Sequence, residues 1–202
     1  MNKWIMAGTA AAFTGAAAFA RSEYERTHLD IVHYDIKTDK LGLEWNGFKA
    51  VFLSDLHDNS FGMENEELLA AIEKEQPDIV VIGGDMLVVK EWAAPHFDML
   101  ANLYKKLVKR YPVYYAFGNH EQRMKEEPLT YPGWWQSYWK VLKDSGMHVL
   151  VNKSEEIIKN GTAMRISGIT LPRECYRKGR IPSLSAGYIA VSYTHLTLAT
   201  IL

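Results

Sequence analysis

The sequence contains a single cysteine, Cys175, among its 202 residues. One cysteine excludes an internal disulfide framework and any zinc site built on several cysteines. The chain also lacks an excess of charge, because 23 Lys and Arg are balanced by 24 Asp and Glu, for a formal net charge of −1. We therefore expect no nucleic-acid partner, since proteins that bind the phosphate backbone normally carry a clear positive excess. The sequence has neither a Gly-x-Gly-x-x-Gly motif nor a P-loop, which argues against a metal-free nucleotide-binding protein.

The first twenty residues differ in composition from the rest of the chain. A stretch without charge runs from Trp4 to Ala20, is rich in alanine, and lies between Lys3 and Arg21. A short positive start, an apolar stretch and a small-residue end are typical of a secretory signal peptide. We expect residues 1–22 to be such a signal peptide or an N-terminal membrane anchor, with a buried core helix as the third alternative. Both export interpretations predict a domain on the extracytoplasmic face of the cell membrane, or a secreted one if the signal is cleaved.

Apolar runs of strand length alternate with amphipathic helical patterns through the middle of the chain. Hydrophobic residues make up 48 % of the sequence and charged residues 23 %, which is typical of a folded domain. Alternating strands and helices predict an α/β fold with a largely parallel central sheet. Asn160-Gly161, a strong two-residue turn signal, predicts a hairpin at 157–166. The other expected strands are 31–36, 49–53, 78–82, 113–117 and 147–151, and the expected helices are 65–75, 95–110 and 134–145.

Polar clusters directly follow three of these strands. The carboxyl ends of parallel strands lie at one edge of a sheet, where ligands bind in such folds, so we expect the clusters to converge. Asp55 and His57 are two residues apart, so in an extended segment their side chains point the same way. Carboxylate, imidazole and amide oxygen together suit divalent ions such as Mn, Fe or Zn. The clusters are Asp55-Leu56-His57, Gly83-Gly84-Asp85 and Gly118-Asn119-His120-Glu121.

Each cluster by itself has an ordinary structural explanation. An Asp after a strand is often the N-cap of the next helix, and an Asn-His pair in a loop is often a turn with a solvated imidazole. Three such clusters in order, each at the end of a strand, favour a metal site. A carboxylate is a natural bridge between two cations held about 3.5–4 Å apart, and Asp85 is the candidate for that bridge.

The ordered motifs Asp-x-His, Gly-Gly-Asp and Gly-Asn-His-Glu resemble those of the calcineurin-like metallophosphoesterases. The segment Leu53-Ser54-Asp55-Leu56-His57, with Gly62 following, looks like the bacterial branch of the family that carries a membrane anchor or export signal. The resemblance covers about residues 47–167. It implies a four-layer β-sandwich flanked by helices, in a metallophosphoesterase that hydrolyses phosphomonoesters or phosphodiesters. The implied cofactors are two divalent metal ions with a bridging hydroxide, and the implied partner is a phosphate-ester substrate, with lipid- or nucleotide-linked esters among the candidates.

The same resemblance implies a role for the residues of the three motifs. His120 would be a catalytic histidine that is not a metal ligand, and it would either protonate the leaving oxygen or stabilise the phosphate in the transition state. Glu121 is expected only to orient the loop. The metal ligands would be Asp55 and His57 for the first metal, Asp85 as the bridge, and Asn119 for the second metal.

The C-terminal part of the sequence departs from the family pattern. The family has a further histidine on a later strand and a Gly-His-x-His motif, and this sequence has neither. The segment from Val191 to Leu202 includes Val-Ser-Tyr-Thr-His-Leu, which one frame of a common sequencing-library transposon end would encode. We therefore expect residues 30–190 to be a partial calcineurin-like phosphoesterase domain with an incomplete second half, and 191–202 to be a non-native tail. On this interpretation the chain as written is inactive, and the alternative function is a non-catalytic fragment or binding module with an incomplete metal site.

Overall fold

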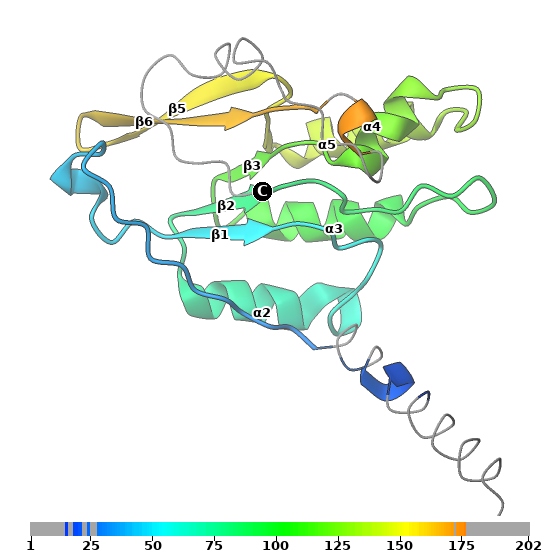
Figure 1. The fold of residues 1–202 in the computed structure, drawn as a ribbon, viewed down its shortest axis with the longest axis horizontal. Coiled ribbons are helices and arrows are strands. Elements are labelled where there is room, and N and C mark those ends of the chain that lie inside the picture. Colours follow the sequence, from blue (N-terminus) through cyan, green and yellow to red (C-terminus); the bar gives the residue numbers. More distant parts are fainter. Residues whose placement is uncertain (1–14, 16–17, 22–23, 25–27, 172, 177–202) are drawn as a thin grey trace, which may run out of the picture.

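The computed structural model describes residues 15, 18–21, 24, 28–171 and 173–176 (Figure 1). Most of the expected N-terminal signal or anchor, and the whole of the expected tail, lie outside these residues. Within the described part of the chain, no helix combines the length and the apolar character needed to cross a membrane.

Four parallel strands form the central sheet, in the order β1-β2-β3-β4. Leu53 at the end of β1 pairs with Ile82 at the end of β2, and Ile82 pairs with Tyr115 at the end of β3. The first three strands therefore end level with one another, and the segments that follow them leave the sheet at one edge. The strands are β1 (Ala50–Leu53), β2 (Ile79–Ile82), β3 (Val113–Tyr115) and β4 (His148–Val149).

Helices cover one face of this sheet. Residues of β2 alternate between its two faces, and Val80 and Ile82 pack into the larger core with buried side chains of the helices. Leu68 of α2, Leu107 of α3 and Leu142 of α5 belong to the same core. These observations confirm the α/β class with a parallel sheet and flanking helices. The helices are α2 (Glu66–Glu75), α3 (Phe97–Val108), α4 (Asn119–Glu126) and α5 (Trp134–Ser145), with short 3₁₀ turns at Leu43–Trp45, Met63–Asn65 and Arg173–Tyr176.

An antiparallel hairpin of β5 (Lys153–Lys159) and β6 (Thr162–Gly168) covers the other face (Figure 1). Asn160 and Gly161 have φ angles of 49° and 83°, the positive values that a type I′ turn requires, so the predicted hairpin is confirmed. A second, smaller core forms where the hairpin meets the sheet. Its buried members are Ile79, Tyr114 and Leu150, and Ile157 and Ile166 of the hairpin pack against them. In the described residues, this hairpin makes up the second sheet of the expected sandwich.

The prediction of a strand at 31–36 is wrong. This segment pairs with no strand in the described structure, and its four large hydrophobic side chains are exposed. It contacts helix α2 instead, through a side-chain hydrogen bond between His33 Nε2 and Glu75 Oε2 at 2.9 Å, at the end of that helix. Alternating apolar residues do not make a strand without a neighbour to accept their backbone hydrogen bonds.

The segment after β3 is a helix rather than the expected loop. Helix α4 begins at Asn119, directly after Gly118. Glu121, the third residue of the helix, accepts a hydrogen bond from Gly118 N–H at 3.0 Å through Oε2. This is the reciprocal half of a capping box, and it starts the helix within the Gly-Asn-His-Glu motif itself.

Candidate metal centre

The segments that follow β1 and β2 run side by side and are joined by backbone hydrogen bonds. Asp55 N–H donates to Gly84 O at 3.1 Å, and His57 N–H donates to Asp85 O at 3.0 Å. Asp55 and His57 have φ angles of 57° and 51°, so the backbone here is left-handed. The expectation of an extended segment is therefore wrong. The two side chains are nevertheless close, since His57 Nε2 lies 3.6 Å from Asp55 Oδ1.

Two glycines allow the segments after β2 and β3 to approach each other closely. A Cβ on Gly84 would overlap the backbone nitrogen of Gly118, and a Cβ on Gly118 would overlap the carboxylate of Asp85. Gly84 also has a φ of 89°, a conformation that side chains rarely adopt. Glycine at both positions is what brings Asp85 against the start of α4.

Asp85 lies at the middle of the site and is only 9 % exposed. Its Oδ2 accepts a hydrogen bond from Asn119 Nδ2 at 2.9 Å, and its Oδ1 accepts one from the backbone N–H of His120 at 2.8 Å. Each carboxylate oxygen has two lone pairs, so each keeps one for a cation.

Three side chains come close enough to share a cation. One nitrogen or oxygen atom from each of His57, Asp85 and His120 lies within 4.8 Å of the other two. The rings of His57 and His120 meet edge to face, with centroids 5.3 Å apart. Asp55 joins the group through its contact with His57. Carboxylates and imidazoles at this spacing fit a divalent cation of the Mn, Fe or Zn kind.

The hydrogen bond to Nδ1 of His120 distinguishes this residue from His57 and Asp85, because it makes the ring a hydrogen-bond donor rather than a ligand of the cation. The backbone N–H of Val89 donates to Nδ1 at 3.1 Å, so the neutral ring assigned from this bond carries its proton on Nε2. Partial burial lowers the pKa of His120 below its usual value, and the negative charge of Asp85 opposes this shift. Neither nitrogen then has a free lone pair, and Nε2 is a hydrogen-bond donor.

Glu121 is a residue of the site whose role the sequence analysis underestimated. It is fully buried, and its carboxylate accepts from Asp85 N–H at 2.9 Å, Met86 N–H at 3.1 Å, Gly118 N–H at 3.0 Å and Tyr115 OH at 2.8 Å. These four donors occupy its four lone pairs, which leaves no place for a proton. Burial raises the pKa of Glu121, and the hydrogen bonds act in the opposite direction. The sequence feature that could have predicted this role is the position of Glu121 three residues after Gly118, which is where the glutamate of a capping box lies.

Beneath Glu121, three phenols connect the site to the helices. Tyr138 OH lies 2.6 Å from Tyr115 OH and 2.8 Å from Tyr104 OH. Burial raises the pKa of all three tyrosines, so they stay protonated and can donate. The carboxylate of Glu121 therefore ties β3 to α3 and α5 as well as to the two glycine turns.

Asp58 is a second residue that the sequence analysis did not single out. Its Oδ2 accepts from Val88 N–H at 2.8 Å, and its Oδ1 accepts from His96 N–H at 3.3 Å. Asp58 therefore anchors the middle and the end of the loop between β2 and α3, which also carries Val89, the donor to His120. The sequence signal was its position directly after the Asp-x-His motif.

The five residues predicted from the sequence thus lie around one point at the edge of the sheet. Residues 48–192 match the family model described as calcineurin-like phosphoesterase. This match covers most of the chain, so the protein belongs to the calcineurin-like phosphoesterase family.

The chain is also similar to a protein whose name places it in the same class. The chain is 32 % identical over 117 residues to the "uncharacterized metallophosphoesterase YkoQ" of Bacillus subtilis (strain 168). The alignment covers 58 % of this chain and 41 % of that protein. The chain therefore spans less than half the length of the relative.

Proposed function

We propose that the full-length protein hydrolyses a phosphomonoester or phosphodiester with the help of two divalent metal ions. The observation that carries the proposal is the position of Asp85, whose carboxylate lies within 4.8 Å of a ring nitrogen of His57 and 2.9 Å from Asn119 Nδ2 while each of its oxygens keeps a free lone pair. A carboxylate so placed can bridge two cations. The proposed ligands are Asp55 and His57 for one metal, Asp85 for both, and Asn119 for the other.

Divalent cations at this site would offset the negative charge of the phosphoryl group and make water a nucleophile near neutral pH. The chain's own residues prepare the site for this chemistry. Glu121 holds together the turn at Gly84 and the turn at Gly118. Asp85 and Asn119, which follow these turns, are therefore positioned before any ligand arrives. Positioning of this kind removes the cost of reorganising the site during the reaction.

The geometry around His120 supports one of its two expected roles over the other. To protonate the leaving oxygen, the ring would need to be an imidazolium with a proton on Nδ1, but the N–H of Val89 already points at that atom. The neutral ring instead offers Nε2–H as a hydrogen-bond donor. We propose that His120 stabilises a phosphoryl oxygen as negative charge develops there in the transition state.

Metal uptake by the chain tests the proposed centre. We expect the purified protein to bind Mn²⁺ or Zn²⁺ in calorimetry and to retain metal through gel filtration, as measured by elemental analysis. Asp85→Asn should bind at least tenfold more weakly. Asp144→Asn is the matched control, because Asp144 lies on the exposed side of α5, where it pairs with Lys140. Equal metal binding by wild type and Asp85→Asn would contradict the proposal.

Turnover distinguishes an enzyme from the alternative, a binding module with an incomplete metal site. The observation that favours the alternative is the absence of a Gly-His-x-His motif from the sequence. For the chain as written we expect metal binding without hydrolysis of 4-nitrophenyl phosphate or bis(4-nitrophenyl) phosphate. Hydrolysis that requires metal and is lost in Asp85→Asn would show an active enzyme and overturn the expected inactivity.

We also propose that residues 1–22 direct the domain to the extracytoplasmic face of the membrane. The support is the charge-free, alanine-rich stretch between Lys3 and Arg21. Alkaline phosphatase folds to its active form only outside the bacterial cytoplasm. If residues 1–22 export the domain, alkaline phosphatase fused after residue 28 should therefore be active in cells. An inactive fusion that is made in normal amounts would contradict this localisation.

A further inference from the structure

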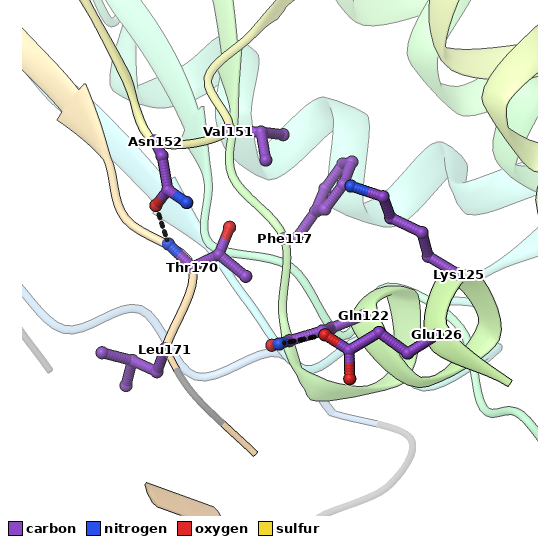
Figure 2. A pocket seen from close by; sticks show the side chains of 8 residues that line it. All are labelled: Phe117, Gln122, Lys125, Glu126, Val151, Asn152, Thr170 and Leu171. Atoms are coloured by element: carbon purple, nitrogen blue, oxygen red, sulfur yellow. Dashed lines mark hydrogen bonds between the residues drawn. The ribbon is translucent and has the colours of Figure 1, made fainter.

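Helix α4 has different surroundings on its two sides. On one side, Gln122, Lys125 and Glu126 line a cavity of about 200 Å³ between the helix and the chain beyond β6 (Figure 2). In the described structure, no residue of the candidate metal centre lines this cavity. His120 precedes Gln122 by two residues, so its side chain leaves the helix on the other side, where it meets the loop between β2 and α3 (residues 83–96). The loop, and not the cavity, therefore holds His120.

One hydrogen bond fixes the orientation of the His120 ring. The backbone N–H of Val89 donates to Nδ1 at 3.1 Å, and no other hydrogen bond among the described residues involves this ring. The ring also contacts His57 edge to face, but that side chain is itself half exposed. The direction of Nε2–H, the donor of the ring, therefore depends on where the N–H of Val89 points.

Backbone hydrogen bonds hold the first part of the loop, and the side chain of Asp58 holds the next part. The segment after β1 donates backbone hydrogen bonds to the carbonyl oxygens of residues 84–86. Beyond that point the carboxylate of Asp58 takes over, with Oδ2 accepting from Val88 N–H at 2.8 Å and Oδ1 accepting from His96 N–H at 3.3 Å. Asp58 therefore joins the middle of the loop to its end, directly beside the donor to His120.

Two successive backbone N–H groups of the loop meet two side chains of the site. Val88 N–H donates to Asp58, and Val89 N–H donates to His120. Neighbouring peptide planes share one Cα atom, so fixing the direction of the first N–H restricts the direction of the second. The side chains of Leu87 and Val89 belong to the core and keep this stretch in place. Apolar packing is not directional, so the direction of the N–H groups comes from the hydrogen bond to Asp58.

We infer that Asp58 is a positioning residue for His120, because it aims the N–H of Val89 at Nδ1 and so keeps Nε2–H free to donate to a phosphoryl oxygen. The chemical consequence rests on the proposed function, since the phosphate would be held by the metal ions beside His120. Asp58 acts through the loop and through His120, and its own carboxylate is occupied by the two backbone donors.

Nuclear magnetic resonance of the ¹⁵N-labelled chain tests the positioning directly. A hydrogen bond transmits a scalar coupling between the backbone nitrogen of Val89 and Nδ1 of His120. We expect this coupling in the wild type and its loss in Asp58→Ala. Asp98→Ala is the matched control, because Asp98 is an exposed aspartate in the first turn of α3, directly after the same loop, and this variant should keep the coupling. A coupling that persists in Asp58→Ala would overturn the inference.

A double-mutant cycle separates positioning from a purely structural role. The probe is inorganic phosphate, titrated in calorimetry into the Mn²⁺-loaded chain. We expect Asp58→Ala to weaken phosphate binding about fivefold and His120→Ala about tenfold. The double variant should bind no more weakly than His120→Ala alone, because Asp58 acts through His120. If Asp58→Ala weakens binding equally with and without His120, its role is structural and the inference fails.

The two measurements also separate this inference from the proposed function. A chain that takes up no Mn²⁺ overturns the metal centre, whereas the coupling needs no metal and still decides whether Asp58 positions the ring. If Asp58→Ala fails to fold, Asp58→Asn decides, with Asp98→Asn as its control. The amide has one acceptor oxygen for two N–H donors, so the coupling should fall to about half. An unchanged coupling in Asp58→Asn would then overturn the inference.

Discussion

The two halves of the candidate metal centre differ in how firmly the fold holds them. The open half is Asp55 and His57, whose side chains are 62 % and 43 % exposed. The buried half is Asp85, Asn119, His120 and Glu121, and within it Asp85 is 9 % and Glu121 0 % exposed.

Hydrogen bonds account for this difference. In the buried half, every carboxylate oxygen of Asp85 and Glu121 accepts from a backbone or side-chain group of a neighbouring turn. In the open half, Asp55 accepts only from the adjacent Ser54 among the hydrogen bonds described, at 2.6 Å. The buried half is therefore part of the folded core, whereas the open half is held to it mainly through the backbone hydrogen bonds of Asp55 and His57. Substitutions in the first should cost stability, and substitutions in the second should cost only metal binding.

The largest expected effect comes from Glu121→Gln. Glutamine offers one acceptor oxygen in place of two, so two of the four buried donors lose their partner, at about 1–3 kcal/mol each. We expect the free energy of unfolding in urea to fall by about 4 kcal/mol. The control is Glu66→Gln on the exposed side of α2, which should change stability by less than about 0.5 kcal/mol. A loss below about 1 kcal/mol in Glu121→Gln would show that the buried half is not held by this carboxylate.

Gly84→Ala should have the next largest effect. The added Cβ overlaps the backbone of Gly118 and requires a left-handed φ of 89°. Gly161 in the hairpin turn has a similar φ of 83° but has nothing within 4 Å of the position of its Cβ. We expect Gly161→Ala to cost about 1 kcal/mol for the backbone alone and Gly84→Ala about 3 kcal/mol, since overpacking adds about 1–3 kcal/mol. Equal thermal midpoints for the two variants would contradict a close contact between the two turns.

Asp85→Asn should combine a moderate loss of stability with a large loss of metal. The amide keeps one acceptor but directs an N–H₂ at a group that already donates, Asn119 or His120. We expect a loss of about 1–2 kcal/mol in urea unfolding together with the tenfold loss of Mn²⁺ affinity described above. If stability were unchanged, Asp85 would belong with the open half.

His57→Ala should affect metal binding and leave stability almost unchanged. The side chain is half exposed, so its removal should shift the free energy of unfolding by less than about 0.5 kcal/mol. Loss of a ligand should weaken Mn²⁺ binding by at least tenfold. A large stability loss without a change in metal affinity would reverse the assignment of this residue.

The smallest effect is expected outside both halves, at Glu155 in the hairpin. Lys153, and after it His148, lower the pKa of Glu155 below its ordinary value of 4.5. A lowered carboxyl pKa stabilises the fold at pH values above 4.5, and this contribution disappears as the pH falls through the lowered pKa. Glu155→Gln should therefore cost about 0.5 kcal/mol at pH 6 and almost nothing at pH 3, measured by urea unfolding. A cost that grows toward acid pH would have the wrong sign for this ion pair.

Much of the fold could be predicted because buried strands and amphipathic helices leave clear patterns. The strands at 50–53 and 79–82 were visible as apolar runs that end in polar residues, and the hairpin was visible in Asn160-Gly161. The segment at 31–36 has the same local pattern but finds no partner strand in the described part of the chain, and no property of its own residues could have shown this. The start of α4 was missed because its capping group is the Glu121 side chain, which was assigned to a loop.

The sequence by itself determined which groups are available for chemistry at this site. Carboxylate, imidazole and amide follow three strands in a fixed order, and the pairing of parallel strands then brings those three positions to one edge. Only the tertiary structure decided how each group is used. The proton on His120 is placed by a backbone N–H 31 residues away, at Val89, and the buried carboxylate of Glu121 accepts from Asp85 N–H, 36 residues away. Hydrogen bonds of this kind join residues that are distant in the chain, so local sequence patterns carry no record of them.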